Sequence, residues 1–119
     1  MGETAGRGNP DIQAHLIAEA LLSADVGFLV WDEDRRYIAV NDCACRLLGT
    51  TREEILGRTV GEQTPNGEAV VEEAVGKQRL AGRLVAKKFD GSGTVELNYT
   101  TFATRTAGMP FMASVIWTD

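Results

Sequence analysis

The chain has 119 residues, 44% hydrophobic and 24% charged, values typical of one soluble globular domain with an ordinary core. Twelve basic against seventeen acidic residues give a net charge of −5, and the basic residues are scattered, so we expect neither nucleic-acid binding nor membrane docking. The two cysteines form no disulfide framework, and no signal-like or long apolar segment is present in the sequence, so a cytoplasmic location is expected.

Residues 1–9 are polar and Gly-rich and are expected to be flexible. Asn9, Pro10 and Asp11 then combine a capping amide, a first-turn proline and an acidic group near the helix dipole, which predicts a helix over 10–23. Its apolar residues recur every three or four positions and form a stripe: Ile12, Leu16, Ile17, Ala20 and Leu21. The domain's own sheet or a second copy of the chain must cover this stripe.

The apolar runs at 26–31 and 37–40 are separated by the turn-forming residues Asp32-Glu33-Asp34 and predict two antiparallel strands. Asn41 is placed to cap a short helix that ends at Gly49.

Thr51 and Glu54 have the spacing of a capping box, and Gly57 ends that turn. A further helix is predicted over 66–77.

Three long strands are predicted at 79–89, 94–104 and 109–117, joined by glycine-containing turns at 90–93 and 107–108. The expected fold is therefore α+β, with one five-stranded antiparallel sheet and several short helices in a single domain over 24–119.

Two strings, NDCACRLLG at 41–49 and REEILGR at 52–58, together with Gly27, Asp32 and the turn at 90–92, closely resemble a PAS domain. The one mild departure is that cysteines flank Ala44, where the family often has alanine. The resemblance implies strand order 2-1-5-4-3, helices covering one face of the sheet, and a pocket between the two.

The resemblance also predicts roles for the helix near the start of the sequence and for its last residues. The helix over 10–23 would be a flanking helix, which in this family often packs on the outer face of the sheet and mediates dimers. Residues 116–119 resemble the beginning of the Asp-Ile-Thr segment through which PAS domains pass a signal to a following helix. The chain is therefore either a domain of a longer sensor or a free-standing PAS protein.

The PAS pattern directs a largely apolar set of side chains toward the pocket: Leu29, Val40, Ala44, Leu48, Ile55, Val60, Val71, Val75, Tyr99, Ser114 and Ile116. These side chains either surround a small molecule or simply fill the core. Because no Arg or Lys is directed inside, an uncharged flat or aliphatic compound would suit the lining better than an anion. The cofactor is unknown, and none is required.

Covalent light sensing is excluded by two positions. Val60 stands where the flavin-binding photosensors of the family carry their reactive cysteine, and the neighbouring Thr59 and Gly61 also differ from the flavin motif. Asn66 stands where the photoactive-yellow-protein branch carries the thiol that holds its pigment.

Metal binding and catalysis are not expected either. His15 is the only histidine and lies outside the helix from which haem-binding members usually take their ligand, so a surface or dimer-interface role is favoured. Cys43 and Cys45 lack the spacing of a metal site and are interpreted as buried, inert thiols. No serine lies in a nucleophile motif, so the chain is not expected to be an enzyme.

The favoured hypothesis is a non-enzymatic sensory or signal-transduction PAS module that forms a homodimer through residues 10–23. Its partner would be a downstream kinase, cyclase or transcriptional output domain. One alternative is a receptor that holds a flavin, haem or lipid without a covalent bond. Another is a constitutive protein–protein adaptor.

Overall fold

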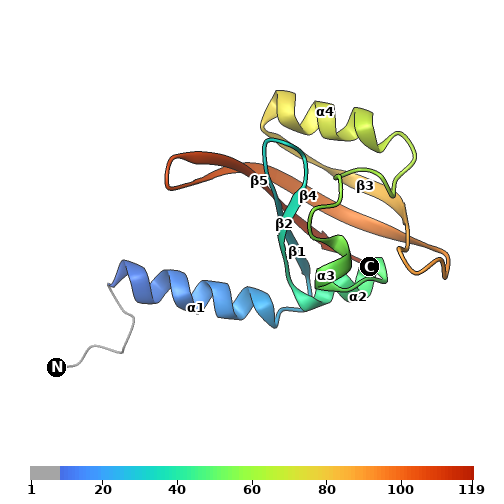
Figure 1. The fold of residues 1–119 in the computed structure, drawn as a ribbon. Helices are drawn as coiled ribbons and strands as arrows, with labels where there is room; N and C mark the ends of the chain where they lie inside the picture. The colour runs from blue at the N-terminus through green and yellow to red at the C-terminus, as the bar shows by residue number, and fades with distance from the viewer. Residues whose placement is uncertain (1–8) are drawn as a thin grey trace.

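The computed structural model describes residues 9–119; most of the N-terminal stretch predicted to be flexible, residues 1–8, lies outside the described residues. Figure 1 shows one twisted antiparallel sheet with short helices on one face and an N-terminal helix that extends away from it. The strand order is β2-β1-β5-β4-β3, as predicted, so the first hairpin is joined to the last strand in the middle of the sheet.

The elements in chain order are α1 (Pro10–Leu22), β1 (Gly27–Trp31), β2 (Tyr37–Val40), α2 (Asp42–Leu48), α3 (Arg52–Ile55), α4 (Gly67–Lys77), β3 (Arg79–Lys87), β4 (Thr94–Thr106) and β5 (Met109–Trp117).

The predicted helix ends are formed by the residues that the sequence indicated. The Asn9 side chain accepts hydrogen bonds from the first turn of α1, and Asn41 accepts one from Ala44 in α2. Gly49 ends α2 with φ of +64°, a left-handed conformation that glycine adopts without strain. Thr51 caps α3 through the Glu54 amide, although the Glu54 carboxylate accepts from the hydroxyl of Thr50 instead of completing a capping box.

β1 begins at Gly27, one residue later than predicted, and two of the long strands end at other residues than predicted. β3 ends at Lys87 and not at residue 89, because the amide of Phe89 turns inward and donates to the carbonyl of Leu48 in α2. β4 continues to Thr106 because the two-residue turn at Ala107 and Gly108, both with positive φ, lets the strands pair up to its edge.

The core lies between the sheet and the helices that cover it. One cluster of buried side chains joins β1, α2, α3 and the far strands around Ile55 and Leu97. A second cluster packs Trp31 and Met112 of the sheet against Val71 and Ala74 of α4. The first fixes α2 and α3 on the sheet, and the second fixes α4.

Helix α1 takes no part in either cluster. None of its residues is buried, and it does not pack on the outer face of the sheet, the position that the family resemblance made us expect. Its last turn is tied to the domain, where the carbonyl of Leu21 accepts a hydrogen bond from the side chain of Asn41. Helix α1 therefore extends away from the sheet and joins it where the chain enters β1 (Figure 1).

Helix α4 begins at a close contact between two glycines. A Cβ atom built on Gly67 would lie 2.0 Å from the carbonyl oxygen of Gly61, whereas one built on Gly76 in the same helix would meet nothing within 4 Å. The segment before α4 can therefore approach the helix only because residue 67 has no side chain.

These two glycines provide a matched test of the contact. We expect Gly67→Ala to lower the free energy of unfolding by about 2 kcal/mol or more, because the backbone of residues 61–67 must move apart. Gly76→Ala should raise it by about 0.5–1 kcal/mol, since alanine favours an open helical position. Urea unfolding of both variants checks this, and equal effects from the two substitutions would contradict it.

Candidate functional site

A cavity of about 90 Å³ lies between the helix-covered face of the sheet, helix α4 and the segment at 59–66 that precedes α4. All five strands contribute to its wall, and α2 closes one end. The lining consists of Leu29, Trp31, Tyr37, Leu48, Val60, Gly61, Gln63, Thr64, Gly67, Val70, Val71, Ala74, Leu84, Ala86, Phe89, Leu97, Tyr99, Thr101, Ser114 and Ile116.

Most of the side chains expected to face the pocket do line this cavity: Leu29, Leu48, Val60, Val71, Tyr99, Ser114 and Ile116. Four do not. Val40, Ala44 and Ile55 lie in the core cluster where α2 and α3 pack on the sheet, and Ile55 is fully buried there. Val75 lines a separate groove beside the turn between β1 and β2.

Several lining residues were missed by the sequence analysis. Trp31 and Thr101 each stand two positions beyond a predicted lining residue, Leu29 and Tyr99, so strand alternation would have found them. Gln63 gave no such signal, because its segment has no regular period.

A chain of polar side chains crosses the cavity wall on the sheet. The indole N–H of Trp31 donates to the hydroxyl of Ser114 at 3.1 Å, and this hydroxyl lies 2.8 Å from that of Thr101. Each hydroxyl carries one hydrogen, and only one of the two is used between Ser114 and Thr101. Within this chain one hydroxyl hydrogen therefore remains for a third acceptor, in a wall that is otherwise mainly apolar.

The cavity lining contains no charged side chain among the residues described. The titratable groups of the lining are the phenol hydroxyls of Tyr37 and Tyr99. Burial, with the nearby negative charge of Glu62, raises the pKa of Tyr37 to about 12. The pKa of Tyr99 is raised for the same first reason, with Glu73 as the second cause. Both phenols therefore stay neutral at physiological pH, which suits an uncharged environment.

The remaining candidate residues lie away from the cavity. His15 is exposed on α1, where its Nε2 lies 3.2 Å from a Glu19 carboxylate oxygen. Cys43 and Cys45 are buried in α2 and unpaired, and burial raises the pKa of the Cys45 thiol. In the described part of the chain, no three His, Cys, Asp or Glu residues cluster as a metal site would need.

Asn41 forms the junction between the cavity-bearing domain and α1. Its Oδ1 accepts from the amides of Phe28 in β1 and Ala44 in α2, at 2.9 and 3.1 Å. Its Nδ2 donates to the carbonyl of Leu21 in α1 and, at 3.0 Å, to that of Val26. One side chain, 3% exposed, thus joins the end of α1, the start of β1 and the first turn of α2.

Comparison with known proteins identifies this architecture. The family model for the PAS fold matches residues 16–113, and the chain belongs to the PAS family. PAS domains are generally sensory, non-catalytic modules. A search of curated proteins found no match. Between residues 9 and 119, no helix has the length and apolar character needed to cross a membrane.

Solved structures show the same fold at low sequence identity. The PAS domain of an HTR-like protein from Haloarcula marismortui is 20% identical, with a TM-score of 0.76 over 90% of this chain and 92% of that one. A domain of a sensory box sensor histidine kinase/response regulator from Geobacter sulfurreducens is 19% identical, with a TM-score of 0.78 over 95% and 100%. A PAS domain from Colwellia psychrerythraea is 15% identical, with a TM-score of 0.80 over 90% and 97%.

The raised pKa of Tyr37 has a measurable consequence. In Tyr99→Phe, where Tyr37 is the only tyrosine, absorbance titration should show ionisation near pH 12 in the folded protein, against about 10 once it is unfolded. Because the folded pKa is the higher one, this group's contribution to stability is complete below pH 10 and is lost as pH rises toward 12. Ionisation near pH 10 in the folded protein would contradict the burial of this phenol.

Proposed function

We propose that this chain is a non-enzymatic sensory module of the cytoplasm that dimerises through α1 and relays a change in its core to a partner or a downstream output domain. The observation that carries the proposal is the junction at Asn41, where one buried side chain bonds to α1, β1 and α2. Two of the structural neighbours are described as domains of sensor histidine kinases, which supports a signalling role.

The path from the cavity to α1 is short. Leu29 of β1 and Leu48 of α2 line the cavity, and Asn41 holds both elements near their N-terminal ends, through the amides of Phe28 and Ala44. A rearrangement that moves β1 relative to α2 would separate the two amides that share the Asn41 Oδ1. It would then also disturb the bond from Nδ2 to Leu21 at the end of α1.

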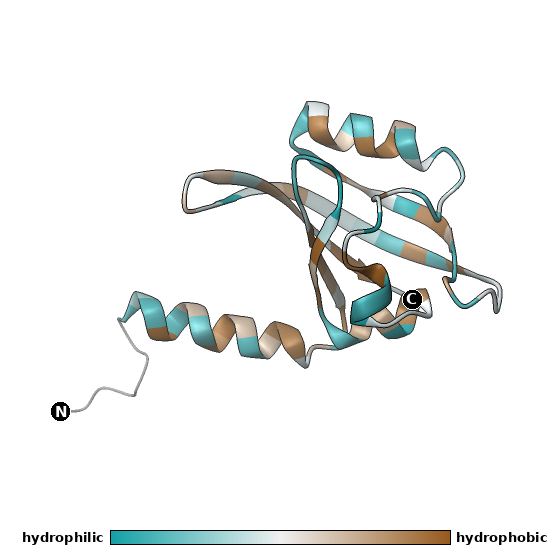
Figure 2. Cartoon of the chain, in the orientation of Figure 1, coloured by the Kyte–Doolittle hydropathy of each residue, from teal (hydrophilic) through white to brown (hydrophobic). Residues whose placement is uncertain are grey.

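Helix α1 offers the surface for dimerisation. Ile12, Leu16 and Ile17 are 39%, 52% and 61% exposed, and Figure 2 shows hydrophobic turns along a helix that extends away from the sheet and the other helices. Ala20 and Leu21 continue the stripe toward the junction, where Leu21 is half-buried. A second copy of the helix is the cover that we propose for it.

A receptor role is the second candidate, and the cavity restricts it. Ligand pockets for drug-sized molecules usually measure about 300–1,000 Å³, whereas this cavity measures about 90 Å³. A flavin or haem would have to displace the lining. The free hydroxyl hydrogen of Ser114 and Thr101 favours a small, uncharged molecule with a hydrogen-bond acceptor.

Glutamate substitutions on the apolar face of α1, compared with one on its opposite face, test the dimer. We expect a molar mass of twice 12.9 kDa by light scattering for the unaltered chain, and a monomer for Leu16→Glu combined with Ile17→Glu. Ala18→Glu, on the opposite side of the exposed helix, should stay dimeric. A monomer of the unaltered chain at tens of micromolar would refute dimerisation while leaving the family and fold intact.

A further inference from the structure

One wall of the cavity is built differently from the others. The sheet and α4 are held by regular backbone hydrogen bonds, whereas residues 59–66 form neither helix nor strand. This segment contributes Val60, Gly61, Gln63 and Thr64 to the lining.

The segment is anchored at its start. The amide of Val60 donates to the carbonyl of Arg35 at 2.8 Å, and Thr59 forms an isolated bridge with Arg36 in the turn between β1 and β2. This end of the wall is therefore fixed to the first hairpin.

Its middle is held to the sheet by Gln63. The amide of Lys87, the last residue of β3, donates to the main-chain carbonyl of Gln63 at 2.7 Å. The Gln63 side chain returns a hydrogen bond from Nε2 to the carbonyl of Lys87 at 2.8 Å. Between residues 61 and 66, these are the only hydrogen bonds to the sheet in the part of the chain that the structure describes.

Two backbone joints lie on either side of this contact. Gly61 has φ of +93° and Asn66 has φ of +58°, so the chain changes direction just before and just after Gln63. The hydrogen bonds inside the segment, from Thr64 to Gly61 and from Gly67 to Thr64, are local turns that can move with it. Residues 61–66 therefore have a hinge at each end and, between the hinges, a latch formed by the two hydrogen bonds between Gln63 and Lys87.

The latch lies at the edge of the sheet. β3 is an edge strand, so releasing Gln63 frees Lys87 without breaking any pairing between strands.

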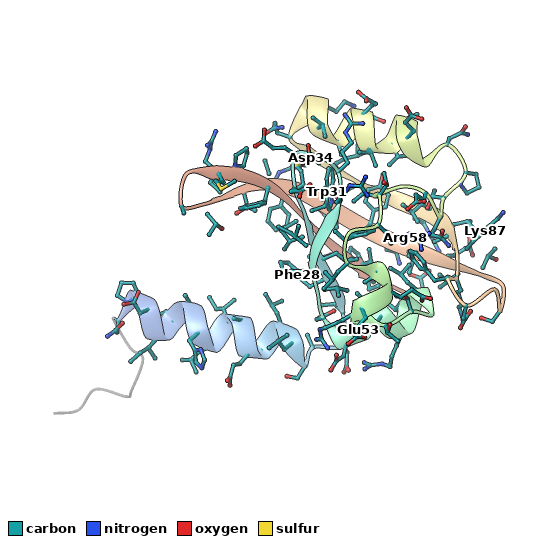
Figure 3. The ribbon with its side chains drawn as sticks, in the orientation of Figure 1. Phe28, Trp31, Asp34, Glu53, Arg58 and Lys87 are labelled. Carbon is teal, nitrogen blue, oxygen red and sulfur yellow. The ribbon has the colours of Figure 1, made fainter. Side chains whose placement is uncertain are left out.

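Arg58 lies over the ring of Phe89, a lining residue, at 5.3 Å, and Figure 3 shows Arg58 and Lys87 on the same side of the molecule.

We propose that residues 61–66 are a movable part of the cavity wall, latched to β3 by Gln63, and that release of this latch admits a small uncharged molecule. The proposal rests on the proposed function in taking the cavity as the sensing site. It also explains how a cavity of about 90 Å³ can exchange its contents without opening the sheet.

The test measures access to Trp31, which is 2% exposed and lines the cavity. In a Trp117→Phe background, Trp31 is the only tryptophan, and acrylamide quenching of its fluorescence reports opening. Gln63→Ala should raise the quenching constant, and hydrogen exchange of the Lys87 amide should rise about fivefold, the factor expected for one net hydrogen bond. Gln63→Glu, which lacks the donor, should behave in the same way.

Asn98→Ala is the matched control, because the Asn98 side-chain amide also donates one hydrogen bond, to the Asp119 carboxylate at 2.8 Å, but from the face of β4 opposite to the cavity-lining Leu97 and Tyr99. It should leave both readouts unchanged. Unchanged values for the Gln63 variants, faster exchange at Lys87 without added quenching, or an equal effect of Asn98→Ala would each overturn the movable wall. None of these readouts depends on dimerisation or signalling, so the outcome is separate from that of the light-scattering test.

Discussion

The buried side chain of Asn41 is the interaction on which the arrangement of this domain depends. A buried amide is costly unless its hydrogen-bonding groups are satisfied, and here both ends of the side chain are used, by β1 and α2 on one side and by α1 and Val26 on the other. Because three elements share one side chain, their relative positions are coupled. The exposed helix α1 is attached to the domain at its C-terminal end through Asn41. The two other elements that Asn41 joins, β1 and α2, also contribute to the wall of the cavity.

The cavity and the junction have different chemistry, which fits different tasks. The cavity is small and uncharged, with neutral phenols and one spare hydroxyl hydrogen on its wall. The junction is held by the directional hydrogen bonds of the Asn41 side-chain amide. A small change in the volume of the cavity can therefore alter the hydrogen-bond geometry at Asn41. This coupling is the physical basis of the proposed relay.

Local chemistry made much of the fold predictable from the sequence. Asn9, Asn41, Gly49 and Thr51 act at helix ends through contacts with their near neighbours, so their roles could be identified without knowledge of the tertiary structure. The candidate site was predicted less completely, because its geometry depends on long-range packing. Val40, Ala44 and Ile55, predicted to line the pocket, lie in the core cluster instead, because α2 and α3 pack on that end of the sheet. The roles of Gln63 and of the bond from Asn41 to Leu21 depend on contacts between distant segments, which no sequence period indicates.

The coupling through Asn41 is tested most directly by Asn41→Asp, which keeps the oxygen that accepts from Phe28 and Ala44 but removes the donor to Leu21 and Val26. Amide hydrogen exchange followed by NMR reports both halves of the junction. We expect exchange in the last turn of α1 to rise roughly tenfold, as for loss of one to two hydrogen bonds, while the Ala44 amide stays protected. Unchanged exchange in α1 with Ala44 still protected would contradict the claim that Asn41 joins the flanking helix to the core.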